Sequence, residues 1–386
     1  MQDQVGYDDE RVAGRSLRRM PKSLQVSRLG RRWASHKTGY PNTPYFYKQN
    51  YNYYLILMVR IAINGFGRIG RAVFKLALEN GINVVAINDL GDVKNLAYLL
   101  KYDTVYRNYD KKVSFRGNNL VVDGKEYEVY KEKDPGKLPW GKLNVDVVVE
   151  STGFFTDREG AEKHLKAGAK RVLISAPAKN PDITVVKGVN DKELKKQKII
   201  SNASCTTNCF APMVKVLDDA FGIKKGLMMT AHAYTSTQKI LDGPNDKFRR
   251  GRAAAMSIIP TTTGAAKAIG EVIPKLKGKL DAIALRVPVV DGSITDFVAE
   301  LKKNVTKEEV NDAFKKAANG KMKGILEYSE EELVSSDVIG NAHSCVIDGL
   351  CTMTVGNIVK VLGWYDNEYG YSCRMIDIIK VISKNL

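Results

Sequence analysis

The sequence predicts an α/β protein with a doubly wound parallel sheet in its first part. One observation is a pattern of apolar strand, glycine turn, amphipathic helix and second apolar strand, which runs from residue 59 to residue 88. Another is a pair of mainly apolar strands at 146–150 and 171–175, with helical sequence between them. Because alternating strands and helices bury both faces of a parallel sheet, this order predicts helices on either side of it.

The composition is that of a globular protein with room for two domains. The chain has 386 residues, of which 44% are hydrophobic, and five cysteines without framework spacing, which indicates a reducing compartment. Its formal net charge is +17. Such an excess of positive charge suits a nucleic acid as partner and equally suits small phosphorylated substrates, so charge alone leaves both open.

Residues 1–57 differ in composition from the rest of the chain. The stretch 15–32 is basic and 40–54 is rich in Tyr, Asn and Pro, so we expect most of this segment to be disordered. A transit peptide would be poor in acidic residues, yet four lie within the first ten, and the uninterrupted apolar stretch of a secretory signal is missing. We favour a third explanation, in which Met58 is the physiological start and the preceding residues are a spurious extension. No membrane span is expected, since the apolar stretch at 55–63 is too short.

The glycine turn has the spacing of a dinucleotide-binding unit. Gly65, Gly67 and Gly70 stand where the chain must turn tightly, approach a pyrophosphate and pack its helix on the strand. Asp89 ends the second strand, where a carboxylate can accept both hydroxyls of an adenosine ribose. A carboxylate there would repel the 2′-phosphate of NADP. The sequence therefore predicts a Rossmann-type domain that binds NAD, and glycines that serve only as turns are the weaker alternative.

The next two strands end in small polar residues. Ligands on open parallel sheets bind at the carboxyl ends of the strands. Thr152 is therefore a candidate for the nicotinamide side of the crevice and Ser175 for the adenosine side. Between them, the helix expected at 161–167 carries His164, which we interpret as a surface or packing residue.

Cys205 reads as a candidate nucleophile. Capping residues at 201–204 and apolar residues at helical spacing after Cys209 place Cys205 in the first turn of a helix. The free amides and the helix dipole favour a thiolate there, although Pro212 leaves the helix onset uncertain. Cys205 and Cys209 alone suggest a metal site or a redox pair, but no second Cys or His pair follows at ligand spacing. We expect no metal.

One histidine is placed to meet that thiol. The apolar strand at 226–230 leads to His232, which we expect just beyond the end of the strand. A lone histidine is usually not catalytic, but a candidate nucleophile and a dinucleotide fold accompany this one. The arginines at 249–252 precede a threonine-rich turn at 261–264, and they form either an anion site or a solvated basic loop.

Four motifs together resemble phosphorylating glyceraldehyde-3-phosphate dehydrogenases. They have the order and spacing of that family, over residues 58–386, and read NGFGRIG (64–70), SNASCTTNC (201–209), TGAAK (263–267) and WYDNEYGYS (364–372).

This resemblance implies a two-domain enzyme. An NAD-binding domain at 58–204 would be completed by a C-terminal helix at 367–386, and an α+β catalytic domain with a mixed sheet would lie at 205–366. It also implies a homotetramer in the cytoplasm, with glyceraldehyde 3-phosphate and inorganic phosphate as small-molecule partners.

The resemblance also assigns chemical roles. Cys205 would attack the aldehyde to give a hemithioacetal, whose oxidation by NAD leaves a thioester that phosphate cleaves to 1,3-bisphosphoglycerate. His232 would act as the base. One implied anion pocket consists of Thr235, Arg250 and Arg286, and the other of Ser204, Thr206, Thr263, Gly264 and again Arg286. The implied cofactor residues are Gly65, Gly67, Arg68, Ile69, Gly70, Asp89, Lys133, Thr152, Ser175 and Asn367.

The sequence departs from the family pattern in one segment after Arg286. Residues 287–295 read VPVVDGSIT in place of a stretch that typically contains Asn-Val-Ser, which puts local strand contacts in doubt. Two other functions stay open. An erythrose-4-phosphate dehydrogenase shares the cysteine motif and the cofactor. A nucleic-acid-binding protein is the alternative from another class, supported only by the charge and by the Tyr-rich run at 40–54.

Overall fold

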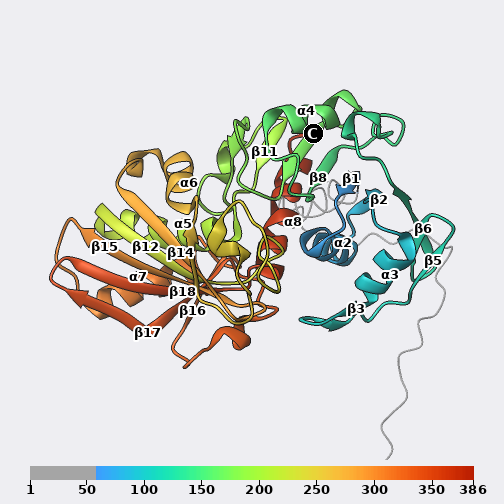
Figure 1. Cartoon of the computed structure of the whole chain (residues 1–386). Coiled ribbons are helices and arrows are strands. Elements are labelled where there is room, and N and C mark those ends of the chain that lie inside the picture. The colour runs from blue at the N-terminus through green and yellow to red at the C-terminus, as the bar shows by residue number, and fades with distance from the viewer. Residues whose placement is uncertain (1–57) are drawn as a thin grey trace, which may run out of the picture. The chain divides into compact units, whose positions relative to one another are not determined.

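The computed structural model describes residues 58–386 (Figure 1). The expected extension and the Tyr-rich run lie in residues 1–57, outside the described residues. The described part contains two large sheets and one small pair, β3 (Tyr102–Asp103) with β4 (Arg107–Asn108). Within it, no helix has both the length and the apolar character needed to cross a membrane.

The first sheet is the doubly wound parallel sheet that the sequence predicts. Its strands are β1 (Arg60–Asn64), β2 (Asn83–Asn88), β5 (Val113–Arg116), β6 (Asn119–Val122), β7 (Lys125–Tyr130), β8 (Val147–Glu150), β9 (Arg171–Ile174), β10 (Ile183–Thr184) and β11 (Ile199–Ser201). Their order is β10-β11-β9-β8-β1-β2-β7-β6-β5. All pairs from β10 to β7 are parallel, and only β6 and β5 add antiparallel pairs at one edge.

Helices cover this sheet because each has one apolar face. They are α2 (Arg68–Glu79), α3 (Val93–Lys101), α4 (Arg158–Lys166) and the C-terminal α8 (Tyr369–Ser383), with 3-10 turns η1 (Pro135–Lys137) and η2 (Asp191–Glu193). In α2, Val73, Phe74 and Ala77 are fully buried, as the helical spacing predicts. The central strand β1 is buried at Ile61 and Ile63, which explains its continuous apolar sequence.

The second sheet is mixed, which confirms the predicted fold class. Its strands are β12 (Ile223–Ala233), β13 (Ile259–Thr262), β14 (Leu280–Val287), β15 (Ser293–Leu301), β16 (Leu326–Ser329), β17 (Cys345–Val355) and β18 (Ile358–Tyr365). The order is β13-β14-β12-β15-β18-β17-β16, with parallel pairs β12–β14 and β16–β17 among antiparallel ones.

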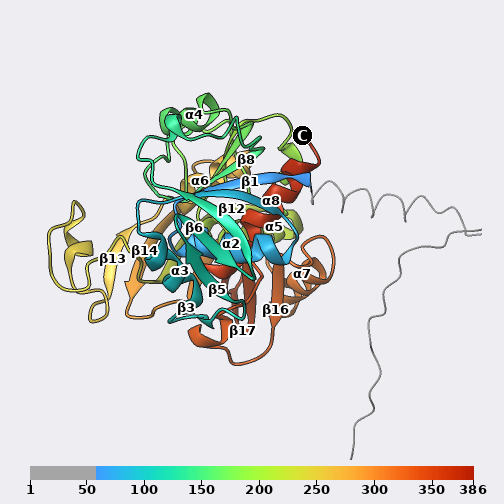
Figure 2. The ribbon, with the colours of Figure 1, turned by 90° about the vertical axis from the view of Figure 1, so that its right-hand side faces the viewer.

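Three helices pack on one face of the second sheet: α5 (Cys205–Phe221), α6 (Ala265–Val272) and α7 (Lys307–Asn319). The 3-10 turns of this part are η3 (Phe248–Gly251), η4 (Pro274–Leu276) and η5 (Ser335–Val338). The segment 234–258, yellow in Figure 2, projects from the sheet beside β13. His232 lies within β12 and not beyond its end as expected, because β12 continues its pairing with β14 as far as Ala233.

The C-terminal helix α8 returns the chain to the first sheet. It packs against α2 and also touches α5 (Figure 1). Tyr371, Met375 and Ile379 are buried in the core of the first sheet, and Tyr371 Oη donates a hydrogen bond to the carbonyl of Ala203 just before α5 (3.0 Å). The last helix therefore links the glycine-turn region with the helix that begins at Cys205. The domain boundaries at 58–204, 205–366 and 367–386 remain predictions.

Candidate active site

The first turn of α5 presents Cys205 to His232. Ser204 is the N-cap of α5, and its hydroxyl accepts a hydrogen bond from the amide of Thr207 (3.1 Å). Cys205 is therefore the first helical residue, as the capping pattern predicts. Its Sγ lies 3.3 Å from Nε2 of His232. The thiol and the imidazole, 27 positions apart in sequence, form a direct contact.

The register of the second sheet brings a cation to the same place. Strands β12 and β14 run parallel with His232 opposite Arg286. Nη1 of Arg286 lies 2.9 Å from Nδ1 of His232 and 2.8 Å from the carbonyl oxygen of Ala233. That oxygen is also 2.7 Å from Nδ1. We assign the ring proton to Nδ1, where the Ala233 carbonyl accepts it, since two unprotonated acceptors at this distance would repel each other; Nη1 of Arg286 then donates to the same carbonyl and not to the ring. Nε2 then presents its lone pair to the thiol.

Burial keeps this pair neutral when no ligand is bound. It raises the pKa of the Cys205 thiol to about 11, although the charge of Arg286 and the amide of Thr206 act in the opposite direction. Burial, together with the charge of Arg286, also lowers the pKa of His232 to about 3. The thiolate that we expected at the helix N-terminus is thus not the favoured resting form, because desolvation outweighs the nearby positive groups.

The predicted anion residues come from several separate segments of the chain. Arg250, on η3, donates from Nε to the hydroxyl of Thr261 (2.9 Å), and its charge is close enough to lower the pKa of His232. The hydroxyl of Thr235 lies 2.9 Å from that of Thr237. Thr263 and Gly264 stand at the start of α6.

Thr206 is the predicted anion residue whose side chain is turned inward. Thr206 is 4% exposed, and its hydroxyl lies 3.0 Å from Oη of Tyr365. The same tyrosine oxygen lies 2.9 Å from the hydroxyl of Thr230 on β12. The Thr206 side chain therefore supports the core beneath Cys205, and both its amide and its hydroxyl act on the thiol to lower its pKa.

A cavity of about 580 Å³ lies at the carboxyl ends of β1, β2 and β8. Five of the ten predicted cofactor residues line it: Gly65, Gly67, Asp89, Lys133 and Thr152. Ser175, Ile69, Gly70, Arg68 and Asn367 are not part of this lining. The carboxylate of Asp89 is held at the cavity wall by the amides of Phe66 (2.7 Å) and Gly91 (2.8 Å).

Two of the glycines are required by close approaches of the backbone. At Gly65, with φ of +92°, a Cβ atom would stand 2.6 Å from the backbone nitrogen of Thr152. At Gly70 it would stand 2.0 Å from the carbonyl oxygen of Gly65, so that only glycine lets α2 pack on the turn. At Gly67, a Cβ atom would meet nothing within 4 Å and would occupy open space beside the cavity. The turn therefore has the steric features that a bound pyrophosphate needs.

Comparison with known proteins identifies the family. A model for the NAD-binding domain of glyceraldehyde 3-phosphate dehydrogenase matches residues 59–158, and a model for its C-terminal domain matches 204–367. The glyceraldehyde-3-phosphate dehydrogenase of Geobacillus stearothermophilus is 59% identical over 331 residues, which cover 85% of this chain and 99% of the relative. Glyceraldehyde-3-phosphate dehydrogenase 1 of Bacillus subtilis is 58% identical over 332 residues, with coverages of 85% and 99%. The chain belongs to the glyceraldehyde-3-phosphate dehydrogenase family. The resemblance seen in the motifs is thereby confirmed, as is an NAD-binding domain at the glycine turn.

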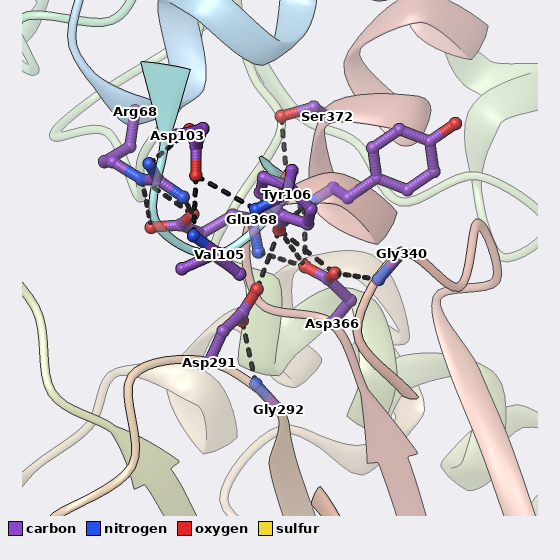
Figure 3. A network of polar contacts seen from close by, with 11 residues as sticks. Arg68, Asp103, Val105, Tyr106, Asp291, Gly292, Gly340, Asp366, Glu368 and Ser372 are labelled. Atoms are coloured by element: carbon purple, nitrogen blue, oxygen red, sulfur yellow. Dashed lines mark hydrogen bonds and ion pairs between the residues drawn. The ribbon is translucent and has the colours of Figure 1, made fainter. Parts of the chain in front are cut away.

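In this dehydrogenase, the side chain of Arg68 is engaged away from the Asp89 cavity. Its guanidinium pairs with Asp103 (2.5 Å) and, in a second contact, with Glu368 (Figure 3). Asn367, next to that glutamate, is 6% exposed, and its Oδ1 accepts a hydrogen bond from the hydroxyl of Ser293 (2.6 Å). The guanidinium of Arg68 is therefore engaged elsewhere, and a role of Arg68 and Ile69 at the pyrophosphate stays a prediction, for which their amides in the first turn of α2 are the suitable groups.

Sequence reasoning missed two asparagines at the base of the cofactor cavity. Nδ2 of Asn88 donates to Oδ1 of Asn64 (2.7 Å), and Nδ2 of Asn64 donates to Glu150 (2.5 Å). The signal was present, since each of these three residues ends a neighbouring parallel strand. The glutamate also contacts His164, which is fully buried. His164 is therefore a packing residue and not a surface residue.

Proposed function

We propose that the Cys205–His232 pair carries out the NAD-dependent oxidative phosphorylation of D-glyceraldehyde 3-phosphate to 1,3-bisphosphoglycerate in glycolysis. Family membership supplies the activity, since the curated relatives are named glyceraldehyde-3-phosphate dehydrogenase. The observation that carries the residue assignment is the 3.3 Å contact between Sγ and Nε2 at the start of α5. The tautomer fixed by the Ala233 carbonyl leaves Nε2 ready to accept a proton.

The neutral pair suits the first step. As Sγ bonds to the aldehyde carbon, the thiol proton passes to Nε2, so that a thiolate need not persist in the buried site. The imidazolium then returns the proton to the former carbonyl oxygen, which yields the hemithioacetal. The charge of Arg286, directly beside His232, stabilises negative charge that develops on sulfur and oxygen.

His232 takes a proton again in the oxidation. Bound NAD would supply the hydride acceptor. The hydroxyl proton of the hemithioacetal moves to Nε2 as the C–H bond gives up its electron pair, and Cys205 is left as a thioester. Phosphate oxygen then attacks the carbonyl carbon and the C–S bond breaks, and the leaving sulfur takes back the proton from Nε2 of His232. The acyl phosphate is released, the neutral Cys205–His232 pair is restored, and the proton of the phosphate passes to solvent. One aldehyde, one NAD and one phosphate are consumed per turnover.

The two anion pockets are proposed to converge on this pair. Arg286 belongs to both, and its guanidinium lies at the imidazole. Arg250, Thr235, Thr263, Gly264, Ser204 and the Thr206 amide complete them in our proposal. Guanidinium groups and the amides at the starts of α5 and α6 suit phosphate oxygens. The carboxylate of Asp89, followed by the apolar Leu90, supports NAD over NADP.

We also propose a homotetramer, because one face of the second sheet is left apolar and exposed. Leu227, Ile283 and Val298, from three neighbouring strands, line a groove of about 920 Å³ together with Phe248 from the projecting segment. Exposed apolar surface of this kind is typical of subunit contacts. Light scattering with size-exclusion chromatography tests this, and a monomer would contradict it. A cytoplasmic location is also part of the proposal, and cell fractionation tests it.

A single assay separates the proposed reaction from its rivals. NADH formation is followed with glyceraldehyde 3-phosphate and with erythrose 4-phosphate, each with and without phosphate or arsenate. Steady turnover of the triose only when phosphate or arsenate is present is expected. Fast turnover of erythrose 4-phosphate without phosphate would favour the erythrose-4-phosphate dehydrogenase. Nucleic-acid binding lost on deletion of residues 1–57, with dehydrogenase activity kept, would assign that second role to the extension.

A further inference from the structure

The segment that departs from the family pattern contains a buried carboxyl group. Asp291, just before β15, is fully buried. Its Oδ1 accepts a hydrogen bond from the amide of Gly292 (2.8 Å), and its Oδ2 lies 2.7 Å from Oη of Tyr106. Tyr106 comes from the connection between β3 and β4, on the side of the first sheet. Asp291, just before a strand of the second sheet, thus contacts a hydroxyl from the part of the chain that forms the first sheet.

The Tyr106 hydroxyl has more acceptors around it than it has protons. Besides Asp291, the two carboxylate oxygens of Asp366 lie 2.9 and 3.0 Å from Oη (Figure 3). The amide of Tyr369 donates to the same oxygen (3.1 Å). One hydroxyl proton can serve only one of the two carboxyl groups. The second carboxyl group must therefore carry a proton of its own, or two anions would face the same oxygen.

The partners of the two aspartates show which one holds the extra proton. Asp366 accepts hydrogen bonds from three amides, those of Gly340 (2.7 Å), Glu368 (2.8 Å) and Tyr369 (2.6 Å), which stabilise an anion. Asp291 accepts only one, from its own neighbour. Burial, together with the charges of Asp366 and Glu368, raises the pKa of Asp291 to about 7, although the hydrogen bonds with Tyr106 and the Gly292 amide act in the opposite direction. Asp291 is the neutral acid and Asp366 the anion.

We propose that Asp291, in its protonated form, is a positioning residue for the nicotinamide end of the cofactor site. The inference rests on the proposed function and on the cofactor role that the family resemblance implies for Asn367, namely a contact with the nicotinamide amide. With a proton on Oδ2, Asp291 becomes the donor across its 2.7 Å contact with Oη of Tyr106, and the tyrosine hydroxyl then donates to Asp366, the residue before Asn367. Two residues after Asp291, Ser293 donates to Oδ1 of Asn367, which leaves Nδ2 of Asn367 free to donate to the ligand.

Loss of the Asp291 proton places a new charge beside the segment 366–368. The groups around it are the Tyr106 hydroxyl and the carboxylates of Asp366 and Glu368. Arg68 compensates Glu368 and Asp103 but makes no ion pair with Asp291. Repulsion between Asp291 and Asp366 would displace the segment that carries Asn367. NAD should therefore bind best below the pKa of Asp291 and more weakly as the pH rises through it.

Direct binding titrations between pH 6 and pH 9 test the proposal. NAD affinity of the full chain should fall about tenfold over this range. This is the effect expected if NAD binding changes the pKa of Asp291 by about one unit. Asp291→Asn keeps a donor towards Tyr106 without a titratable proton, so its NAD affinity should stay near the pH 6 level throughout. Asp312→Asn, an exposed change on α7, is the matched control and should retain the pH dependence. ADP-ribose, which lacks nicotinamide, should bind with little pH dependence.

A second variant tests the same inference in case the Asp291→Asn protein does not fold. Tyr106→Phe interrupts the chain of donors, and it should weaken NAD binding at pH 6 while ADP-ribose affinity is retained. Equal pH dependence in the wild type and Asp291→Asn would overturn the inference, as would a wild type whose NAD affinity does not change. A chain that bound no NAD at any pH, or formed no NADH, would instead overturn the proposed function.

Discussion

Two buried histidines, one beside each large sheet, show how the same side chain serves structure in one place and chemistry in another. His164 on α4 has both ring nitrogens engaged by partners that cannot react: Trp140 donates to Nδ1 (3.0 Å) and Glu150 contacts Nε2 (3.0 Å). His232 on β12 is fixed through Nδ1 and turns Nε2 to a thiol. The two sites differ in the groups beside the ring. At His232, the reactive thiol of Cys205 and the guanidinium of Arg286 lie next to the imidazole, whereas His164 has no reactive partner.

Unused hydrogen-bonding capacity is found on the side of His232. Within the described residues, Nε of the neighbouring Arg286 is buried and has no partner. A buried donor of this kind is costly unless a ligand completes it. The His164 cluster, in contrast, combines its histidine with Glu150, Asn64 and Trp140 in a closed network. Changes at His232 should therefore alter rates, and changes at His164 should alter stability.

The largest effect is expected for Cys205→Ser, which removes the thiol but keeps a side chain of similar shape. Loss of the nucleophile should reduce kcat by at least about 10⁴-fold, because the hydroxyl is a far weaker nucleophile. The Asp89 cavity is untouched, so NAD affinity in a direct titration should be that of the wild type. A variant that kept more than a few per cent of the NADH-forming activity would exclude Cys205 as the nucleophile.

His232→Asn should slow the reaction by about 10²- to 10⁴-fold, the usual contribution of a general base. It should also slow alkylation of Cys205 by iodoacetamide at pH 7, because the thiol loses the acceptor for its proton. Burial raises the pKa of this thiol, so alkylation in the variant should recover only as the pH increases. Unchanged rates in both experiments would remove His232 from the mechanism.

Sequence patterns predicted where the reactive residues lie better than they predicted the environment of those residues. Capping residues and helical spacing placed Cys205 in the first turn of α5, and the glycine pattern located the turn at Gly65. The neutral state of the thiol could not be predicted, because it depends on desolvation where Cys205 packs against the cores of both sheets, which include residues far away in sequence. The contact of Arg286 with His232 likewise depends on the register of β12 and β14, which no local pattern encodes.

The same substitution at the other histidine, His164→Asn, is expected to act on stability. It leaves the indole NH of Trp140 without its acceptor and removes one of the partners of the Glu150 carboxylate in a buried site, which should cost about 2–4 kcal/mol. The kcat per folded molecule should stay within about twofold, since no contact with Cys205 is lost. Urea unfolding and the NADH assay measure the two effects. A large fall in kcat with unchanged stability would reverse the roles assigned to the two histidines.

The smallest effect is expected for Cys209→Ala, four residues beyond the nucleophile on the same helix. Cys209 is fully buried, and its Sγ lies near the sulfur of Met213 (4.0 Å) and the carbonyl of Gly363 (3.6 Å). Alanine removes these weak contacts and the packing of the sulfur in the core of the second sheet, so unfolding should become easier by about 1 kcal/mol and kcat should remain within about twofold. Iodoacetamide should label Cys205 first in the folded wild type, because Cys209 has neither exposure nor a base. Mass spectrometry that found both cysteines labelled at equal rates would show that the environment of Cys205 confers no selective reactivity.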